Sequence, residues 1–494
     1  LGKLTWVYDD NKITIDGDVS IAFTEDVAGR FEAMGWHVQN IGDRANDLGA
    51  VDAALEAARA VTDRPSLVIV QSHIGFGAPN KQDTASAHGE PLGEEEIRLA
   101  KAAYGWPEDA KFLVPEPVTA HMGARVGTGR QLVADWNERF QRYRADHPEL
   151  ADRLESWIAG ELPDGWASDL PEFDPGDGPL ATRAASGKVL AALASRVQSL
   201  IGGSADLSGS NKTLLAGSPD FGRGTPEGRN LRWGVREHSM CAISNGIALH
   251  GGLRPYAATF FIFTDYARPS IRLAALMHQP VIYVMTHDSI GLGADGPTHQ
   301  PVEHLASFRA MPRMRCIRPA DANEVREAWK VALERDDGPT ILVLTRQGVP
   351  ILDREGTAPA SGLRRGAYVL APETGERPDV VLLASGSEVQ YALAAREELA
   401  SRDVDARVVS FPSWELFRDQ DETYRESVIP DGVPRVSMEA GATFGWTEWV
   451  GPDGVSLGVD RFGQSGSQPD NYRDYGLTTG DLVRTTLHLL GRGD

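Results

Sequence analysis

The residues of this chain that are best suited to chemistry lie in one short segment, 287–301, which reads HDSIGLGADGPTHQP. It combines two histidines, two aspartates and two hydroxyl side chains with three glycines, and it follows an apolar stretch at 281–285 that predicts a strand. Open α/β sheets bind their ligands outside the carboxyl ends of the strands. The alternative is a glycine-rich structural turn, but such a turn needs neither the second histidine nor both aspartates. The segment therefore predicts a site for proton transfer.

Two segments near the beginning of the chain could bind a metal ion or a phosphate. Asn11 and the carbonyl of Ile13 follow an expected strand at 5–8 and offer hard oxygen ligands suited to Mg²⁺ or Ca²⁺. The glycine-rich residues 74–77 and the later His88 could approach and bind a phosphate, because glycine lets the backbone come close. An Asx turn at Asn11 and an ordinary loop before His88 are the structural alternatives.

Carboxylates and aromatic rings form a further group of candidates. Asp206 and Ser210 lie in a segment of small residues, GGSADLSGSN, at the end of an expected strand. Glu237 begins an expected helix at 237–249, where a negative charge is electrostatically favourable, so this residue could be purely structural. A run of aromatic residues could line a pocket or simply belong to the core: Phe260, Phe261, Phe263 and Tyr266.

The charge balance limits the ligands that the chain can bind. Lys and Arg number 49 against 70 Asp and Glu, so the formal net charge is −21, which disfavours nucleic acids and anionic membranes. A phosphate-bearing ligand must therefore be held by a local cationic cluster of His and Arg. Arg183 and Arg346, at the start of an expected helix and the end of an expected strand, suit bidentate phosphate binding, although either could form a surface ion pair. The two cysteines, Cys241 and Cys316, are too few for a disulfide framework, which suits a reducing cytosol, and no apolar run reaches transmembrane length.

The elements that must position these residues follow the alternating pattern of an α/β protein. A length of 494 residues exceeds one hydrophobic core and predicts two to three domains with parallel sheets. Strands are expected at 5–8, 66–70, 281–285, 340–345, 380–384 and 406–410. Helices are expected at 24–34, 51–61, 183–197, 237–249 and 321–334, the last with Asp321 as N-cap and Glu324 completing a capping box.

Composition also predicts where the domains end. The chain becomes acidic and then rich in proline and glycine over residues 149–179, which predicts a linker at 151–180, and a second linker is expected near 353–365. The expected domains are 1–150, 181–352 and 366–494. The last of them contains few clustered ionisable groups, and its Gly386-Ser387-Glu388 segment is expected to be structural.

In this order, the segments resemble the transketolase family, thiamine-diphosphate enzymes that move two-carbon ketol units between sugar phosphates. The resemblance covers nearly the whole chain and rests on YDDNKITIDG, IGFGAPNK, GGSADLSGSN, WGVREHSM, ATFFIFTDYARPS, THDSIGLGADGPTHQP, LTRQ and ASGSEV. It implies an α/β fold with three α/β domains and mostly parallel sheets, the thiamine-diphosphate-binding fold. These would be a partial diphosphate-binding domain, a pyrimidine-binding domain and a C-terminal domain.

The resemblance implies a role for each candidate residue. Glu237 is similar to the glutamate that hydrogen-bonds the cofactor's aminopyrimidine and thereby promotes formation of the reactive thiamine diphosphate ylid. The other implied cofactor contacts are Asp206, Phe260, Phe263, Tyr266, His88 and Asn11, and the implied ligands of the metal, Mg²⁺ or Ca²⁺, are Asn11 and Ile13. The implied substrate contacts are Arg183, Ser210, His287, Asp295, His299, Arg346 and His88, with His287 and His299 joining Glu237 as catalytic residues.

The resemblance also implies a homodimer with two sites, sugar-phosphate substrates, no nucleic-acid or membrane partner, a cytoplasmic location and a place in the pentose phosphate pathway. The beginning of the chain departs from the family. No Gly-Asp-Gly motif, whose aspartate is a metal ligand, precedes Leu1, so we expect the family's N-terminal part to be a separate subunit, cleaved or omitted. Residues 81–87, KQDTASA, lack a histidine that the family often has there. The alternative functions are dihydroxyacetone synthase, which accepts formaldehyde, and a silent or incomplete subunit that needs an N-terminal partner.

Overall fold

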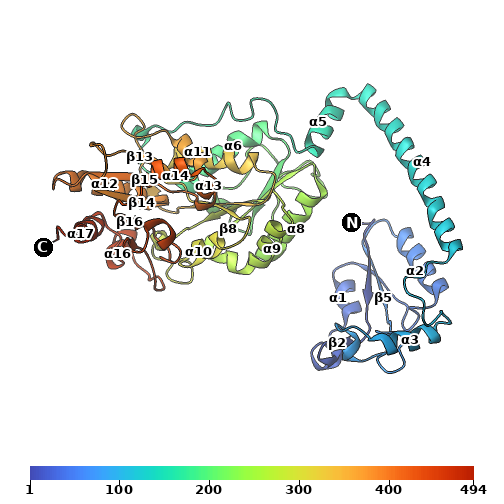
Figure 1. Ribbon diagram of the computed structural model, residues 1–494. Coiled ribbons are helices and arrows are strands. Elements are labelled where there is room, and N and C mark those ends of the chain that lie inside the picture. The colour runs from blue at the N-terminus through green and yellow to red at the C-terminus, as the bar shows by residue number, and fades with distance from the viewer. Residues whose placement is uncertain (494) are drawn as a thin grey trace. The chain divides into compact units, whose positions relative to one another are not determined.

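The computed structural model of the chain describes residues 1–493 and divides into two compact units, Leu1–Trp136 and Asn137–Asp494 (Figure 1). The first unit contains a three-stranded and a two-stranded sheet, and the second contains two five-stranded sheets and a two-stranded one. None of the helices in residues 1–493 has the length and apolar character needed to cross a membrane.

The first unit is built on a three-stranded parallel sheet with the order β1-β5-β4. Its central strand is buried along its whole length, and Ala54 and Ala58 of the helix α2 pack against Val68 and Val70. The elements of this unit are β1 (Thr5–Asp9), β2 (Ile13–Thr14), β3 (Gly17–Asp18), η1 (Val19–Ile21), α1 (Val27–Ala33), β4 (His37–Asn40), α2 (Leu48–Ala60), β5 (Ser66–Val70), η2 (Ala85–Ala87) and α3 (Glu94–Ala103).

Two helices follow where the sequence suggested the end of a domain and a linker. Helix α4 (Glu116–Asp146) has 31 residues and none of them is buried. Helix α5 (Pro148–Ile158) starts with a proline at its first turn and buries Ala151. Helix α5 therefore covers the first part of the expected linker at 151–180, and this part is helical instead of irregular. Residues 159–179 contain only the short η3 (Pro175–Asp177).

The middle of the chain forms a five-stranded sheet, β10-β11-β9-β8-β7, in which every neighbouring pair is parallel. Its strands are β7 (Leu200–Ser204), β8 (Arg254–Phe260), β9 (Ile282–Thr286), β10 (Arg315–Ile317) and β11 (Thr340–Leu344). Its helices are α6 (Thr182–Arg196), α7 (Ser208–Asn211), α8 (Glu237–His250), α9 (Thr264–Leu276), α10 (His304–Arg309) and α11 (Ala322–Glu334). A two-stranded antiparallel pair, β6 (Leu180–Ala181) with β12 (Gly348–Val349), joins the two ends of this region.

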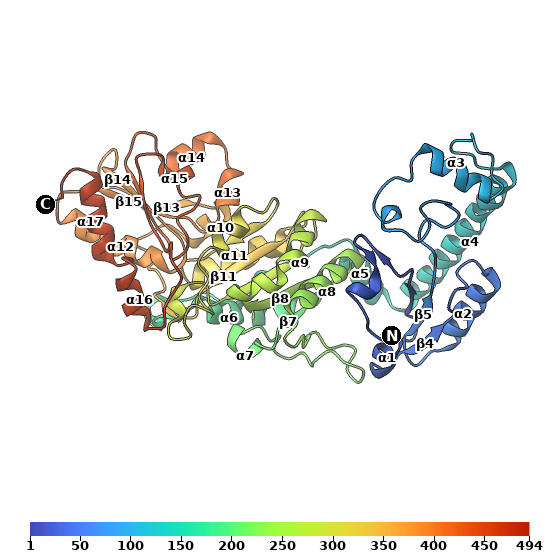
Figure 2. The same cartoon turned by 90° about the horizontal axis from the view of Figure 1, so that it is seen from below.

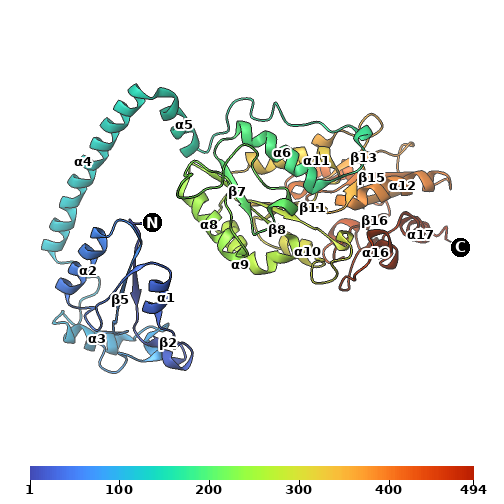
Figure 3. The ribbon, with the colours of Figure 1, turned by 180° about the vertical axis from the view of Figure 1, so that it is seen from behind.

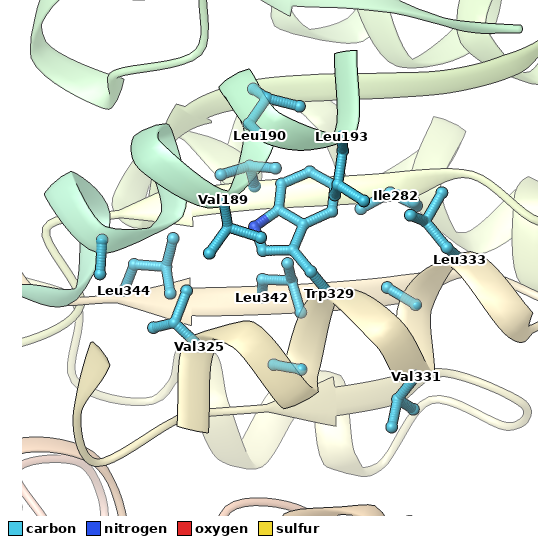
Figure 4. Close-up of a cluster of buried hydrophobic side chains, with 14 of the residues drawn as sticks. Val189, Leu190, Leu193, Ile282, Val325, Trp329, Val331, Leu333, Leu342 and Leu344 are labelled. Carbon is cyan, nitrogen blue, oxygen red and sulfur yellow. The ribbon is translucent and has the colours of Figure 1, made fainter. Parts of the chain in front are cut away.

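Alternate side chains of these strands point to opposite faces, and each face is covered by helices. One face packs against α6 and α11, which lie side by side in Figure 3, and its largest buried side chain is Trp329. Figure 4 shows this indole between the helices and the strand residues Ile282 and Leu342, and its Nε1 donates to Ser186 Oγ at 2.9 Å. The other face packs against α8 and α9, which run side by side in Figure 2.

The last part of the chain forms a second five-stranded sheet, β13-β15-β14-β16-β17, in which only the β13–β15 pair is antiparallel. Its strands are β13 (Tyr368–Ala371), β14 (Val380–Ala384), β15 (Ala406–Ser410), β16 (Arg435–Met438) and β17 (Val455–Leu457). Its helices are η6 (Ala360–Arg365), η7 (Gly386–Glu388), α12 (Val389–Ala400), α13 (Trp414–Arg418), α14 (Glu422–Val428), α15 (Thr447–Val450), α16 (Gln468–Asp474) and α17 (Thr479–Leu489). Helices α12 and α17 cover one face, and three tryptophans cover the other: Trp414, Trp446 and Trp449.

The mostly parallel α/β architecture confirms the predicted fold class. The predicted N-cap of α11 is also confirmed, since Asp321 Oδ1 accepts from the Glu324 N–H at 2.8 Å. The second half of the capping box is different: Glu324 Oε2 accepts from the Ala320 N–H at 2.7 Å instead of from Asp321. The expectation of few clustered ionisable groups after residue 366 is wrong, because Glu388 and Glu439 are both buried in ion pairs with arginines of the middle region.

Candidate active site

Four strands of the middle sheet end at one edge, and each of them brings a candidate residue there. Asp206 follows β7, Phe260 ends β8, His287 follows β9 and Arg346 follows β11. Because all neighbouring strands are parallel, their carboxyl ends share this edge. This is the edge at which an open α/β sheet binds ligands.

The start of α6 is tied to the same edge by a pair of threonines. The Thr182 N–H donates to Thr345 Oγ1 at 3.0 Å, and the Thr345 N–H donates to Thr182 Oγ1 at 2.7 Å. The next residue, Arg183, is thereby placed beside Ser210, whose carbonyl and hydroxyl oxygens accept from its Nη1 at 2.9 and 3.0 Å. Two of the expected substrate contacts are therefore in direct contact with each other.

A chain of buried hydrogen bonds fixes the proton of His287. Ser204 Oγ donates to a backbone carbonyl and accepts from Asn211 Nδ2 at 2.8 Å, and Asn211 Oδ1 accepts from Thr286 Oγ1 at 2.8 Å. Thr286 has one hydroxyl proton, so the oxygen that lies 2.8 Å from His287 Nδ1 must accept there. His287 then carries its proton on Nδ1 and presents an unprotonated Nε2, 3.5 Å from Arg183 Nη1. Thr286 and Asn211 were not among the predicted site residues, although both lie in segments that suggested the site.

The same environment keeps His287 neutral. Burial first of all, and then the positive charges of Arg183 and Arg346 and the nearby His299, lower the pKa of His287 to about 3. The expectation that this histidine contributes to a cationic cluster is wrong for the free site. Its positive charge comes from the two arginines, and His287 contributes a hydrogen-bond acceptor.

Aromatic rings gather around this imidazole. The ring centroids of Phe260 and His287 are 3.6 Å apart, and those of Phe260 and Phe263 are 5.7 Å apart in a stacked arrangement. His299 meets Phe263 edge-on at 5.4 Å, and Tyr266 lies 6.2 Å from Phe263. All five predicted residues therefore form one cluster, with Tyr266 the most exposed at 66%. The remaining expected contact on this loop, Asp295, is exposed to solvent.

Glu237 is the first residue of α8 and only 8% of its surface is exposed. Within residues 1–493 its carboxylate has no hydrogen-bond partner. Its side-chain oxygens are not among the fully buried polar atoms that lack a partner, so the carboxylate of this largely buried residue is open to a ligand that donates to it. This residue and the aromatic cluster fit the pyrimidine end of thiamine diphosphate, which offers ring nitrogens to a carboxyl group and a flat face to aromatic rings.

Backbone strain marks two of the site residues. Asp206 has φ +59° and His287 has φ +61°, the left-handed region that residues with a Cβ adopt at a cost of about 1 kcal/mol or more. Both lie directly after strands at the site edge, and such strain is concentrated in functional sites.

Not every ionisable group of the loop 287–301 serves the site. Asp288 is 1% exposed and forms a buried ion pair with Arg318, with Oδ2 2.8 Å from Nη2. Burial raises the pKa of Asp288, and the guanidinium opposes this shift. Of the two aspartates that pointed to proton transfer, one is therefore structural.

The remaining candidates lie in the first unit. His88 follows η2 and is exposed. Asn11 lies between β1 and β2, and Ile13 is the first residue of β2. Asn11 Oδ1 accepts from the Ile13 N–H at 3.0 Å, which is the Asx turn considered as the alternative to a metal site. The turn leaves a second lone pair on Oδ1, so the amide oxygen still fits a hard cation.

Models of three protein domains match this chain in sequence. Residues 1–163 match the thiamine diphosphate binding domain of transketolase, residues 178–351 match its pyrimidine binding domain, and residues 366–478 match the transketolase-like C-terminal domain. The transketolase of Geobacillus stearothermophilus is 49% identical over 494 residues, which are 100% of this chain and 74% of that protein. The chain belongs to the transketolase family.

Solved structures of the family support this assignment. Transketolase from Leishmania mexicana matches with a TM-score of 0.94 at 41% identity, over 99% of this chain and 72% of that one. A Pichia stipitis transketolase in complex with sedoheptulose 7-phosphate also has a TM-score of 0.94, at 40% identity, over 99% of this chain and 72% of that one. The function is accordingly that of the family: an enzyme that transfers two-carbon ketol units with thiamine diphosphate and a divalent metal as cofactors.

Residues 1–163 match the thiamine diphosphate binding domain, and this match does not support the expectation of a missing or separate N-terminal part. The chain spans about three quarters of the length of the bacterial relative that it matches.

Proposed function

We propose that the cluster around Glu237 and His287 is the catalytic centre for ketol transfer between sugar phosphates. The observation that carries this proposal is the largely buried residue Glu237, whose carboxylate makes no hydrogen bond within residues 1–493, in the same sheet region as an imidazole held neutral by its surroundings. Thiamine diphosphate, when bound, supplies the carbon nucleophile that ketol transfer requires. The tasks of the protein are to hold the cofactor, to move protons and to bind phosphate.

Glu237 is proposed to hydrogen-bond the pyrimidine ring of the cofactor. The aromatic rings of Phe260, Phe263 and Tyr266 are proposed to pack against the face of that ring. Glu237 lies at the first turn of α8, where the N-terminal end of the helix carries partial positive charge. Its carboxyl group is proposed to exchange a proton with the cofactor ring. Asp206, in its strained conformation at the end of β7, is proposed as a second cofactor contact.

Phosphate binding is assigned to Arg183 and Arg346, with Ser210 orienting the first of them. Phosphate binding needs local positive charge in a chain whose net charge is −21, and the two guanidinium groups at one edge of the sheet supply it. His287 is proposed to accept a hydrogen bond from a substrate hydroxyl through Nε2. His299 and Asp295, further along the same loop, are proposed to contact the reacting carbonyl and a hydroxyl of the sugar.

The first unit is proposed to supply the diphosphate and metal contacts, with Asn11 and the carbonyl of Ile13 as ligands of Mg²⁺ or Ca²⁺ and His88 near the phosphates and the substrate. The match of residues 1–163 to the thiamine diphosphate binding domain supports this role. We further propose functional domains at 1–150, 181–352 and 366–494, which the three separate main sheets support.

A homodimer is proposed because the outer face of the middle region is apolar. Helix α8 is buried on its inner side, yet it exposes Ile243 and Leu249 by 49% and 56%, and its neighbour α9 exposes Leu273 and Leu276 by 45% and 61%. A helix that is apolar on both sides is a buried helix, so a partner must cover this face. A second copy is favoured because symmetric homodimers are the commonest assemblies and the family's solved structures are homodimeric.

A cytoplasmic location is also proposed, supported by the two free, buried cysteines Cys241 and Cys316. A role in the pentose phosphate pathway follows from the sugar-phosphate substrates and remains part of the proposal.

The test is a coupled assay with xylulose 5-phosphate as donor and ribose 5-phosphate as acceptor, with and without thiamine diphosphate and Mg²⁺. We expect turnover that requires both additions. Formaldehyde offered as acceptor in parallel distinguishes dihydroxyacetone synthase, which would prefer it. A purified, folded chain that shows no turnover with any of these acceptors at saturating cofactor would refute the proposal.

A further inference from the structure

The loop 287–301 is held in place largely by the C-terminal domain. Asn471 Nδ2 donates to the carbonyl of Ile290 at 3.2 Å, and Ser465 Oγ donates to the carbonyl of Ala294 at 2.6 Å. Both donors lie in the segment between β17 and the end of α16. The loop itself belongs to the middle region, so these bonds connect two domains of the chain.

A buried glutamine of the loop also forms a hydrogen bond with the C-terminal domain. Gln300 is 2% exposed, and its Nε2 donates to the carbonyls of Gly293 and Gln464 at 2.9 and 3.0 Å. The fit is close, since a Cβ placed on Gly463 would lie 1.8 Å from Gln300 Oε1. Any side chain at position 463 would therefore push Gln300 away from the loop.

The beginning of the loop is anchored by a buried ion network. Arg318, fully buried, pairs with Asp288 in the loop and with Glu388 in the C-terminal domain. Gly386 has φ +55°, and a Cβ there would lie 2.6 Å from Arg318 Cζ, so only glycine lets the backbone lie against the guanidinium. Residues 386–388 therefore form the surface against which the Arg318 guanidinium packs.

These anchors surround Asp295. It is exposed and lies between two glycines with left-handed backbone conformations, Gly293 with φ +98° and Gly296 with φ +80°. The residue before Asp295 is anchored, because the carbonyl of Ala294 accepts the hydrogen bond from Ser465 Oγ. The position of Asp295 in the site therefore depends on a hydroxyl group of another domain.

We propose that the C-terminal domain is the support that positions the substrate loop, and that Ser465 is a positioning residue for Asp295. The inference rests on the proposed function for the role of Asp295, but the anchoring itself does not. The proposal assigns a function to the C-terminal domain, whose own sheet contributes no candidate site residue.

The test replaces the hydroxyl that makes the contact. Ser465→Ala removes one neutral hydrogen bond, so we expect KM for the sugar phosphate to rise about 3- to 10-fold while kcat changes about 2-fold or less. Ser465→Thr keeps the hydroxyl and should restore KM. Hydrogen exchange of the amides at 291–296 should be faster in Ser465→Ala, and this measurement does not depend on activity.

The matched control is Ser401→Ala. Ser401 is exposed in the same domain and donates to the carbonyl of Glu398 at 2.6 Å, the same kind of bond at the same length, but within the end of its own helix. It should change neither KM nor the exchange at 291–296. Unchanged exchange and unchanged KM in Ser465→Ala would overturn the inference. A wild-type protein without turnover would instead overturn the proposed function, and the exchange measurement would still decide whether Ser465 anchors the loop.

Discussion

At the scale of single residues, the proposal depends most on Glu237. Only 8% of this residue is exposed, and its carboxylate makes no hydrogen bond within the described chain, so the carboxylate contributes no hydrogen bond to folding. Glu237→Gln keeps the shape and removes the ability to exchange a proton. We predict a fall in kcat of about 100-fold or more, the usual contribution of a general acid–base group, with little change in melting temperature.

The coupled assay and thermal unfolding of the same samples check this prediction. Glu227→Gln serves as control, because Glu227 is exposed and its side chain forms no hydrogen bond or ion pair within residues 1–493. If Glu237→Gln keeps wild-type kcat at saturating cofactor, the carboxylate is not the proton-transfer group.

His287 gives a prediction for stability against pH. Its pKa is about 3 in the folded protein and about 6.5 in an unfolded chain, so below pH 6.5 the unfolded state binds a proton that the folded state does not. Stability is therefore lost as the pH falls from about 6.5 toward 3. Between pH 7 and pH 5 this group alone should cost about 2 kcal/mol.

The check compares the wild type with His287→Asn by chemical denaturation at pH 7 and pH 5. Other groups titrate in both proteins, so the difference between the two free energies of unfolding isolates the histidine. We expect that difference to shift by about 2 kcal/mol in favour of the variant at pH 5. An identical difference at both pH values would mean that His287 is not held neutral.

At the scale of elements, the contact between the middle and C-terminal sheets depends on Arg318. This fully buried guanidinium balances two buried carboxylates, Asp288 and Glu388. Arg318→Met leaves both carboxylates without a counter-charge, so we predict a loss of about 3–5 kcal/mol in the free energy of unfolding. Chemical denaturation at pH 7 measures it.

The triple variant Arg318→Met, Asp288→Asn, Glu388→Gln is the matching control. It removes the charges together, and a buried ion group replaced as a whole is often tolerated far better than one that has lost a single partner. We expect most of the stability to return. A triple variant as unstable as the single one would show that the arginine acts through packing and not through charge.

At the scale of the whole molecule, the sequence predicted regular elements well and long-range contacts poorly. The strands at 66–70, 380–384 and 406–410 were predicted to the residue, because apolar runs between turn residues have one simple interpretation. Helix α4 was not predicted, because its first half contains three glycines, Gly123, Gly127 and Gly129, which disfavour a helix.

In the candidate site, too, the local segments were predicted and the long-range contacts were not. The loop and the strand ends were found from local composition, and the structure brings Phe260, His287 and His299 together. The role of Asp288 was misjudged because its partner, Arg318, is 30 residues away and Glu388 is further still. Local sequence cannot distinguish a proton-transfer carboxylate from one that is paired in the interior, because the difference lies in which distant residue meets it.

Assembly gives the last prediction. The exposed apolar face of α8 and α9 should be covered by a second copy, so a charge placed in it must either be buried unpaired or prevent association. Ile243→Glu puts that charge on a side chain that is 49% exposed in the single chain. We predict a shift from dimer to monomer in light scattering at micromolar concentration, with the fold retained.

Leu154→Glu makes the same change on α5, at a leucine that is 39% exposed and outside this face, and should leave the dimer intact. Monomeric Ile243→Glu should also bind thiamine diphosphate more weakly if the cofactor site is completed across the dimer, which calorimetry measures. A dimer that survives the substitution would place the association surface elsewhere. The apolar side of α8 would then have to be covered by another partner. This helix exposes isoleucine and leucine on its outer face and carries no charge there, and such a surface is stable only when it is buried against another surface.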